Sequence, residues 1–271
     1  MNIERRRNAP VVLVIAGFDP SGGAGIIADI RTIEALSCTA VAAVASITFQ
    51  NTHSYSGALH QSAASMRAQI QAILAEHEIA AVKVGMLPTP EIVREVAQLM
   101  READLPNRVV DPVMETTSGG QLMEEDAFGV FVTELLPLAR IVTPNIPEAE
   151  KLAGLNITDE DSMRQAAGRI RELGARAVLI KGGHLKEDAG ARRKEPGNTE
   201  RWALDLVDDH GEVTLFKGEW FDGPSVRGTG CMLSSAIACG LAKGDELIAA
   251  IETAKQFVAR AIQNSTLQIQ K

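Results

Sequence analysis

Four consecutive residues, Gly228-Thr229-Gly230-Cys231, combine a possible anion-binding turn with a possible catalytic side chain, and a helix-like run from Met232 to Ala242 follows them. Glycines allow a tight turn with uncovered backbone N–H groups, and the first turn of a helix adds unpaired donors and the positive end of its dipole. Such a turn favours a phosphate. We expect the Cys231 thiolate to be stabilised there and to accept the proton of a substrate hydroxyl during phosphoryl transfer. The alternative is a structural glycine turn with a small residue buried at the helix start.

A second glycine-rich segment, Gly17 to Gly25, follows the apolar run Val11 to Ala16 and enters a helical pattern. Its glycines permit a ligand to approach the backbone closely. The segment is neither a Rossmann nor a Walker loop, because the glycine spacing differs and no Gly-Lys-Ser/Thr follows. Asp29, one turn into the predicted helix, is a candidate for hydrogen bonding to a ligand or to nearby backbone.

Polar residues also follow the later apolar runs, where a parallel sheet would bind its ligand. The segments are Gln50-Asn51-Thr52, Lys83-Val84-Gly85-Met86, Asp111-Pro112-Val113-Met114, Thr143-Pro144-Asn145-Ile146-Pro147-Glu148 and Lys181-Gly182-Gly183-His184. The Gln50 amide can both donate to and accept from the edge of a heterocycle, or it can be a simple turn residue. Met86 is predicted to lie in the core or to form a soft apolar wall of a pocket.

Two of these residues, Asp111 and Glu148, form a pair of carboxylates at comparable positions in the predicted sheet. Such a pair suits Mg²⁺ that is held largely through water together with nucleotide phosphates. Lys181 follows another strand, where its ammonium group can neutralise a phosphate. The competing interpretation assigns Glu148 to helix capping and Asp111 to hydrogen bonds within its loop.

The elements that must position these residues alternate between short apolar runs and longer helical patterns, which is typical of parallel strands joined by crossover helices. Strands are predicted over 11–16, 39–48, 80–84, 108–111, 141–143 and 177–181, and helices over 24–36, 63–75, 90–103, 126–136 and 161–173, the last with Thr158 as N-cap. Residues 202–207 and 213–216 are predicted to form an antiparallel pair. The expected fold is a three-layer α/β/α domain over residues 11–271, with a mainly parallel sheet covered by helices on both faces. Residues 1–10 are predicted to be a solvated tail, and residues 184–200, which have almost no large apolar side chains, a mobile lid.

Composition excludes several classes of function. The 271 residues are 45% hydrophobic and carry a formal net charge of −8, without the basic stripe of a nucleic-acid-binding protein. The longest nearly apolar stretch, Thr39 to Phe49, is too short to span a membrane, because about 20 residues are needed. The three cysteines have neither disulfide nor metal spacing, which predicts a reducing cytoplasm and core positions for Cys38 and Cys239.

Taken in order, seven segments resemble the ribokinase superfamily and, within it, the hydroxymethylpyrimidine/phosphomethylpyrimidine kinases of thiamine biosynthesis. They are Ala16-Gly17-Phe18-Asp19-Pro20-Ser21-Gly22-Gly23-Ala24-Gly25, Gln50-Asn51-Thr52, Lys83-Val84-Gly85-Met86-Leu87, Asp111-Pro112-Val113-Met114, Thr143-Pro144-Asn145-Ile146-Pro147-Glu148-Ala149, Lys181-Gly182-Gly183-His184 and Gly228-Thr229-Gly230-Cys231. The resemblance runs from about Val12 to the C-terminal helices. It implies that ATP phosphorylates 4-amino-5-hydroxymethyl-2-methylpyrimidine and then its monophosphate.

The resemblance also implies roles for individual residues. Gln50 and Asp29 would contact the aminopyrimidine, in a pocket shaped by Gly17, Ala24, Met86 and Val113. Cys231 would stand where sugar kinases carry an aspartate base, and the backbone of Gly228, Thr229, Gly230 and Cys231 would form an anion hole. Asp111 and Glu148 would organise Mg²⁺, with Lys181 and Asn145 on the ATP side. A homodimer is expected by analogy.

The chain departs from the family pattern at Arg227, where the family often has histidine, and at Phe18 and Phe49, where smaller residues are common. Arg227 is a candidate for holding a substrate phosphate through a bidentate contact. A pyridoxal or pyridoxine kinase is the first alternative function, and a non-catalytic pyrimidine-binding regulatory domain is the second. A binding domain would need neither a metal site nor a base. A sugar kinase is disfavoured because Cys231 replaces the expected aspartate.

Overall fold

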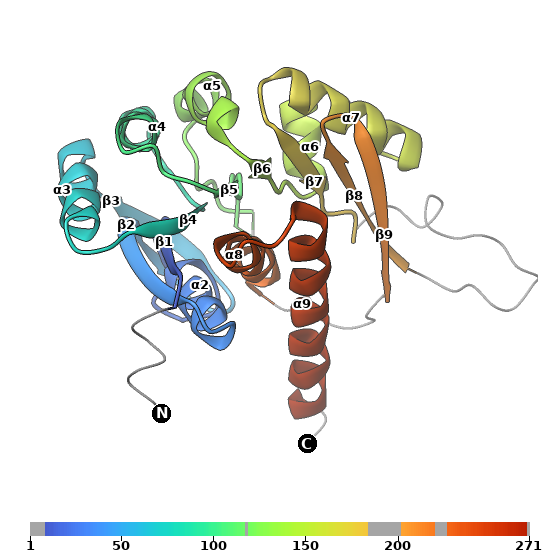
Figure 1. Cartoon of the computed structure of the whole chain (residues 1–271), viewed down its shortest axis with the longest axis horizontal. Coiled ribbons are helices and arrows are strands. Elements are labelled where there is room, and N and C mark those ends of the chain that lie inside the picture. Colours follow the sequence, from blue (N-terminus) through green and yellow to red (C-terminus); the bar gives the residue numbers. More distant parts are fainter. Residues whose placement is uncertain (1–8, 117–118, 184–201, 220–226, 270–271) are drawn as a thin grey trace, which may run out of the picture.

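The computed structural model of the chain describes residues 9–116, 119–183, 202–219 and 227–269. Within these residues the strands form one sheet in the order β3-β2-β1-β4-β5-β6-β7-β8-β9 (Figure 1). The central strands, which pair in parallel, are β2 (Thr39–Gln50), β1 (Val11–Phe18), β4 (Ile79–Val84), β5 (Arg108–Val110), β6 (Ile141–Val142) and β7 (Ala177–Ile180). Antiparallel strands complete both edges, namely β3 (Tyr55–His60) on one side and β8 (Trp202–Asp209) with β9 (Glu212–Glu219) on the other.

Helices cover both faces of the sheet, so the predicted three-layer α/β/α fold is confirmed (Figure 1). One layer contains α3 (Ala63–Leu74), α4 (Pro90–Glu102), α5 (Glu125–Val130), the π-helical turn η1 (Phe131–Leu135), the 3₁₀ turn η2 (Leu136–Leu138), α6 (Ile146–Ala153) and α7 (Glu160–Glu172). The other contains α2 (Gly25–Ala35), α8 (Thr229–Ala242) and α9 (Leu247–Ile269). Alternate residues of β1 enter opposite cores: Leu13 packs toward the first layer and Val12 toward the second.

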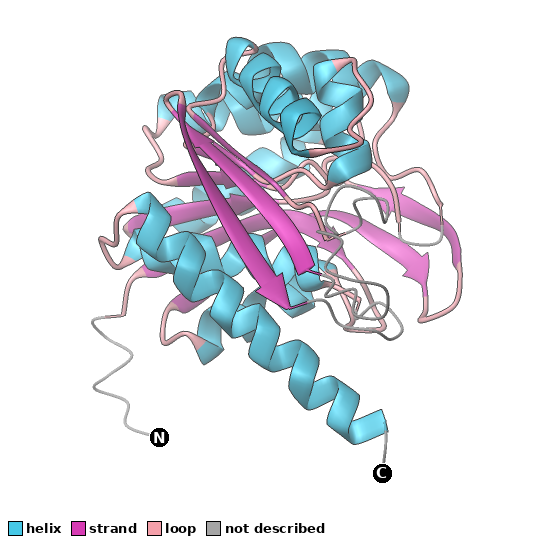
Figure 2. Cartoon of the chain, turned by 90° about the vertical axis from the view of Figure 1, so that its right-hand side faces the viewer, coloured by secondary structure: helices cyan, strands magenta, loops and turns pink. Residues whose placement is uncertain are grey.

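The antiparallel pair β8–β9 extends along the same side of the molecule as α9 (Figure 2). Lys255 of α9 joins them, because its ammonium group pairs with Asp205 of β8 and lies 5.9 Å from the centre of the Phe216 ring of β9. The predicted antiparallel pair is therefore confirmed, with longer strands and a turn at His210 and Gly211.

Several local predictions require correction. The N-cap of α7 is Asp159 rather than Thr158, because the Asp159 carboxylate accepts the N–H of Ser162 at 2.8 Å. The helix predicted over 126–136 is regular only to Val130 and then changes to a π-helical turn. Strand β3 and the short helix α6 were not predicted. The lid predicted over 184–200 lies outside the described residues, as does most of the 1–10 tail.

The strand order brings the predicted site segments to one edge of the sheet. The carboxyl ends of β2, β1, β4, β5, β6 and β7 lie in a row, and they are followed by Gln50-Asn51, the Gly17 loop, Gly85-Met86, Asp111, Thr143 and Lys181. The chain reverses its direction of winding between β1 and β4, where open α/β sheets form a binding crevice. Among the described residues, no helix has the length and apolar character needed to cross a membrane.

Candidate active site

Two glycine-rich loops pack backbone against backbone at the start of α2 and α8. Gly228 has a φ of +80°, and a Cβ there would lie 2.2 Å from the carbonyl oxygen of Gly23. Gly25 has a φ of +56°, and a Cβ there would lie 2.3 Å from the carbonyl oxygen of Gly17. Only glycine fits either position, because a side chain would both strain the backbone and collide with a carbonyl. The two loops predicted from sequence therefore form one surface, with the N-termini of two helices directed into it.

Lys181 lies directly beneath the first turn of α8. Its Nζ donates to Asp111 Oδ1 at 3.0 Å, and a Cβ at Gly230 would lie 3.2 Å from the same Nζ. Thr143 and Ser234 also donate to the Asp111 carboxylate, each at 3.3 Å. Burial alone would raise the pKa of Asp111, but the cations Lys181 and Lys83 outweigh it and hold that pKa below its usual range. Asp111 is therefore an ionised carboxylate, and the Gly228–Cys231 turn lies over a fixed ammonium group.

Glu148 caps a helix, as the competing interpretation of its position in the sequence predicted. Asn145 and Glu148 form a reciprocal capping box at the start of α6: the Glu148 carboxylate accepts the Asn145 N–H at 2.8 Å, and the Asn145 side-chain oxygen accepts the Glu148 N–H at 2.9 Å. Burial raises the pKa of Glu148 to about 7, with Lys181 opposing the rise and Asp111 adding to it. The carboxyl group therefore changes its charge near neutral pH.

The predicted Mg²⁺ site offers two carboxylates as ligands. Asp111 and Glu148 interact electrostatically with each other and with Lys181, so they share one region. Within the described ranges, no group of three or more His, Cys, Asp or Glu residues is arranged to hold a metal ion. Two carboxylates fit a Mg²⁺ ion that keeps several waters and takes its other ligands from a nucleotide. They do not form a site that would hold a metal alone.

Asp29 is the partner of a buried lysine. Its carboxylate is 0% exposed; Oδ2 accepts from Lys83 Nζ and Oδ1 from Ser235 Oγ, both at 2.8 Å. The side chain therefore faces the sheet, because Lys83, also 0% exposed, projects from β4 and needs an anionic partner. Burial by itself lowers the pKa of Lys83, but the carboxylates of Asp29 and Asp111 outweigh it and keep the amine protonated. Asp29 thus balances a buried cation in addition to its proximity to the predicted site.

Cys231 occupies the first turn of α8 as expected, but its ionisation differs from the expectation. The residue as a whole is partly buried, and its sulfur lies among buried groups and accepts the N–H of Gly25. Burial raises the pKa of the thiol to about 11, although Lys83 and the Gly25 N–H act in the opposite direction. Desolvation outweighs the favourable end of the helix, so Cys231 is a neutral thiol at neutral pH in the protein without ligands.

The predicted pocket residues surround the same loops. A Cβ at Gly17 would lie 2.8 Å from the sulfur of Met86, so the Met86 side chain packs on bare backbone. Ala24 donates its N–H to Asp19 Oδ2 at 3.0 Å, and Val113 donates its N–H to the Asp111 carbonyl at 2.8 Å. Gln50 ends β2, and its side-chain oxygen accepts from Arg227.

Sequence reasoning missed the roles of Lys83, Ser234 and Ser235. Each is a buried polar side chain bonded to a site carboxylate. The available signal was the presence of two adjacent serines and one lysine inside otherwise apolar runs, because fully buried polar groups need partners. Cys38 and Cys239 are buried, which confirms their predicted core positions.

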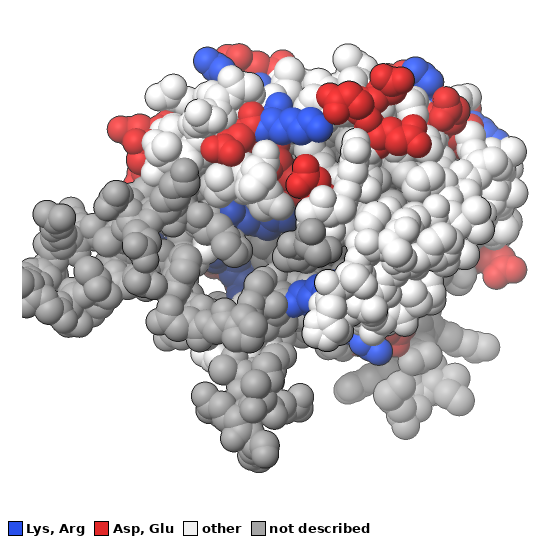
Figure 3. Space-filling model, turned by 180° about the vertical axis from the view of Figure 1, so that it is seen from behind, with Lys and Arg blue, Asp and Glu red and all other residues white. Residues whose placement is uncertain are grey.

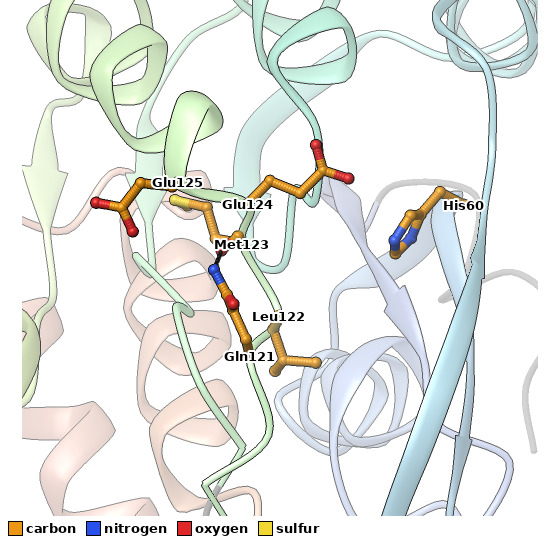
Figure 4. A pocket seen from close by; sticks show the side chains of 6 residues that line it. All are labelled: His60, Gln121, Leu122, Met123, Glu124 and Glu125. Atoms are coloured by element: carbon orange, nitrogen blue, oxygen red, sulfur yellow. Dashed lines mark hydrogen bonds between the residues drawn. The ribbon is translucent and has the colours of Figure 1, made fainter.

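A separate cavity of about 220 Å³ lies away from these residues (Figure 4). His60 of β3 faces it from one side, and the segment Gln121, Leu122, Met123, Glu124 and Glu125 lines the other. None of the predicted site residues lines this cavity. On the face of the molecule shown in Figure 3, basic side chains are visible inside the central hollow, and acidic ones gather along the upper rim.

The chain is similar to known kinases over most of its length. The family model described as phosphomethylpyrimidine kinase matches residues 19–271. The hydroxymethylpyrimidine/phosphomethylpyrimidine kinase of Streptomyces coelicolor is 38% identical over 253 residues, which cover 93% of this chain and 88% of that protein. The crystal structure of phosphomethylpyrimidine kinase from Clostridium difficile is 34% identical, with a TM-score of 0.79 and coverage of 93% and 99%. The pyridoxal kinase of Staphylococcus aureus in complex with AMP-PCP and pyridoxal is 30% identical, with a TM-score of 0.82 and coverage of 94% and 88%.

Proposed function

Because this chain belongs to the phosphomethylpyrimidine kinase family, we propose that it uses ATP to phosphorylate 4-amino-5-hydroxymethyl-2-methylpyrimidine and then its monophosphate. The product is the pyrimidine diphosphate required for thiamine diphosphate synthesis. One observation carries the proposal: the Gly228–Cys231 turn places backbone donors and a thiol above Lys181, which is itself paired with Asp111. Phosphoryl transfer needs this combination of alignment and charge neutralisation more than it needs covalent help.

In the second transfer the attacking atom is a phosphate oxygen of the monophosphate. In the first, the hydroxymethyl oxygen forms a bond to the γ-phosphorus while the bond between that phosphorus and the β–γ bridging oxygen breaks, and ADP leaves. The N–H groups of the Gly228–Cys231 turn and the ammonium of Lys181 stabilise the negative charge on the transferred group. The hydroxyl proton passes to the thiolate of Cys231. That thiolate forms when the thiol gives its proton to water before the transfer, and the Gly25 N–H and Lys83 stabilise it.

We also assign the nucleotide side of the site. Asp111 and Glu148 would hold a hydrated Mg²⁺ ion, and Lys181 and Asn145 would contribute to binding the ATP phosphates. When bound, the ion would supply positive charge that offsets the charge of the phosphates. Glu148 takes part as a carboxylate, so its pKa of about 7 links this role to pH.

The proposal includes a homodimer in the cytoplasm, where ATP is available and the free thiols stay reduced. Support for a self-contact comes from the edge hairpin β2–β3, which exposes Ile47, Phe49 and Leu59. Ile47 and Leu59 are direct cross-strand partners, so they form one apolar patch. Sedimentation equilibrium of native protein and Phe49→Ser tests this: a native monomer would exclude the dimer.

The deciding experiment measures Mg²⁺- and ATP-dependent phosphorylation of the hydroxymethylpyrimidine, its monophosphate and pyridoxal side by side. Native protein is compared with Cys231→Ala, and Cys239→Ala on the same helix is the matched control, because Cys239 is buried in the core. We expect pyrimidine turnover that is lost in Cys231→Ala and retained in Cys239→Ala. Turnover of pyridoxal alone would transfer the assignment to the pyridoxal kinases, and binding without transfer would favour the regulatory alternative.

A further inference from the structure

Arg227, the residue before the Gly228–Cys231 turn, is held by the opposite wall of the site. Its Nη2 lies 3.3 Å from Asp19 Oδ2 and donates to Gln50 Oε1 at 2.5 Å. Its Nη1 donates to the carbonyl oxygen of Asn51 at 2.5 Å and to Ser21 Oγ at 3.4 Å. One guanidinium group thus joins the loop after β1, the end of β2 and the start of α8.

The contact with Gln50 determines which way its amide faces. A guanidinium group has only donors, so the atom of Gln50 that meets it must be the carbonyl oxygen. This removes the usual ambiguity between the oxygen and nitrogen of a glutamine side chain. The Gln50 –NH₂ group is consequently turned away from Arg227, and within the described part of the chain it donates to no other group.

The same guanidinium has an anionic partner of its own. Asp19 is 1% exposed, and its carboxylate also accepts the backbone N–H groups of Ser21 at 2.9 Å and Ala24 at 3.0 Å. Both terminal nitrogens of Arg227 thus contact protein acceptors, and a substrate phosphate that drew the guanidinium away would leave Asp19 without its cation. Leaving Asp19 unpaired is costly, because a buried charge without a partner is strongly destabilising.

We propose that Arg227 is a positioning residue that acts through Gln50, rather than a ligand of the substrate phosphate. By holding Gln50 Oε1, it presents the Gln50 –NH₂ group to the bound heterocycle and selects a ring with a hydrogen-bond acceptor, such as a ring nitrogen. The proposal rests on the pyrimidine kinase function above and deepens it. It replaces the bidentate phosphate contact expected from the sequence.

Calorimetric binding of the unphosphorylated hydroxymethylpyrimidine and of its monophosphate, without ATP, tests the proposal. We expect Arg227→Ala to weaken both ligands by the same factor, roughly tenfold, which corresponds to one hydrogen bond that is no longer preorganised. Arg31→Ala is the matched control, because Arg31 donates to the carbonyl of Gly22 in the same loop at 3.0 Å. It should leave both affinities unchanged.

A double-mutant cycle separates action through Gln50 from an independent effect. We expect Arg227→Ala to add little to Gln50→Ala, because residues in one hydrogen-bond network are not additive. A substrate analogue in which CH replaces the ring nitrogen that accepts from Gln50 should bind native protein weakly. Its affinity should fall little further in Arg227→Ala. A loss confined to the monophosphate, or two losses that multiply independently, would overturn the proposal. Arg227→Lys keeps the charge without the planar fork and gives the same comparison if the alanine variant does not fold.

A further measurement keeps this proposal separable from the proposed function. In ¹⁵N-labelled protein without ligand, the side-chain amide signal of Gln50 is identified by its loss in Gln50→Ala. We expect this signal to shift in Arg227→Ala and to stay in place in Arg31→Ala. An unmoved signal would refute the Arg227–Gln50 contact, whereas failure of native protein to bind any pyrimidine would refute the function instead.

Discussion

The replacement Glu148→Gln is expected to stabilise the protein at alkaline pH while it removes kinase activity. Glutamine keeps the acceptor that receives the Asn145 N–H, so the capping box at the start of α6 is preserved. What disappears is the cost of ionising a buried carboxyl group. Burial raises the pKa of Glu148 from 4.5 to about 7, so the folded protein holds this proton over a range in which the unfolded chain has released it.

The magnitude follows from this difference in proton affinity. At about 1.4 kcal/mol for each tenfold difference, a rise from 4.5 to about 7 corresponds to about 3 kcal/mol. The stabilisation provided by the bound proton is fully present below pH 4.5 and is lost as the pH rises to about 7. Above that pH, native protein should be about 3 kcal/mol less stable than Glu148→Gln, a melting difference of roughly 6–12 °C. At pH 4.5 the two proteins should unfold alike.

Urea unfolding of the two proteins between pH 4.5 and pH 8.5 measures this difference, with ATP phosphorylation recorded on the same samples. Glu252→Gln is the control, because Glu252 is an exposed carboxylate on α9, and its unfolding free energy should change by less than about 0.5 kcal/mol. A constant gap between native protein and Glu148→Gln across this pH range would refute the electrostatic reasoning. Full retention of activity would remove Glu148 from the nucleotide side of the site.

Two further predictions concern Lys83 and Cys231. Lys83→Met should lower the free energy of unfolding in urea by about 3–5 kcal/mol, because it leaves Asp29 buried without its cation. The double variant Lys83→Met/Asp29→Leu should recover most of that loss. A double variant no more stable than Lys83→Met would contradict the ion-pair argument. Cys231 has a thiol pKa of about 11, so at pH 8 its reaction with iodoacetamide should be slower than that of a free cysteine by a factor of roughly ten or more, and the rate should increase as the pH rises toward 11. Peptide mapping identifies the labelled cysteine. Rapid labelling of Cys231 at pH 7 would show that the thiolate is already formed.

The sequence was sufficient to predict the layers of the fold because most strands are fully apolar and most helices carry periodic apolar faces. Strand β3 escaped prediction because Tyr55–His60 is an edge strand with a mixture of exposed and half-buried residues, so it has neither the apolar run of a central strand nor a clear alternation. Helix α6 escaped because it has only eight residues and begins within a segment containing two prolines. Its start is nevertheless encoded locally, since the Asn145–Glu148 spacing is that of a capping box.

At the site, residue types and order predicted that Asp111, Glu148 and Lys181 lie in one region, but not the Lys83–Asp29 pair or the charges of the groups. The N-terminal position of Cys231 in α8 favours a thiolate, whereas its burial favours a thiol, and only the packed structure shows that burial prevails. The same packing encloses two ion pairs, Lys83–Asp29 and Lys181–Asp111, each of which is close to neutral as a unit. Ionised Glu148 then leaves the Lys181–Asp111 region with one net negative charge above pH 7, the charge that a hydrated divalent cation would offset. The proposed ATP site thus has a negative charge, from Glu148, where the metal is proposed to bind. Lys181 and the backbone N–H groups of the Gly228–Cys231 turn lie where the transferred phosphoryl group is proposed to bind.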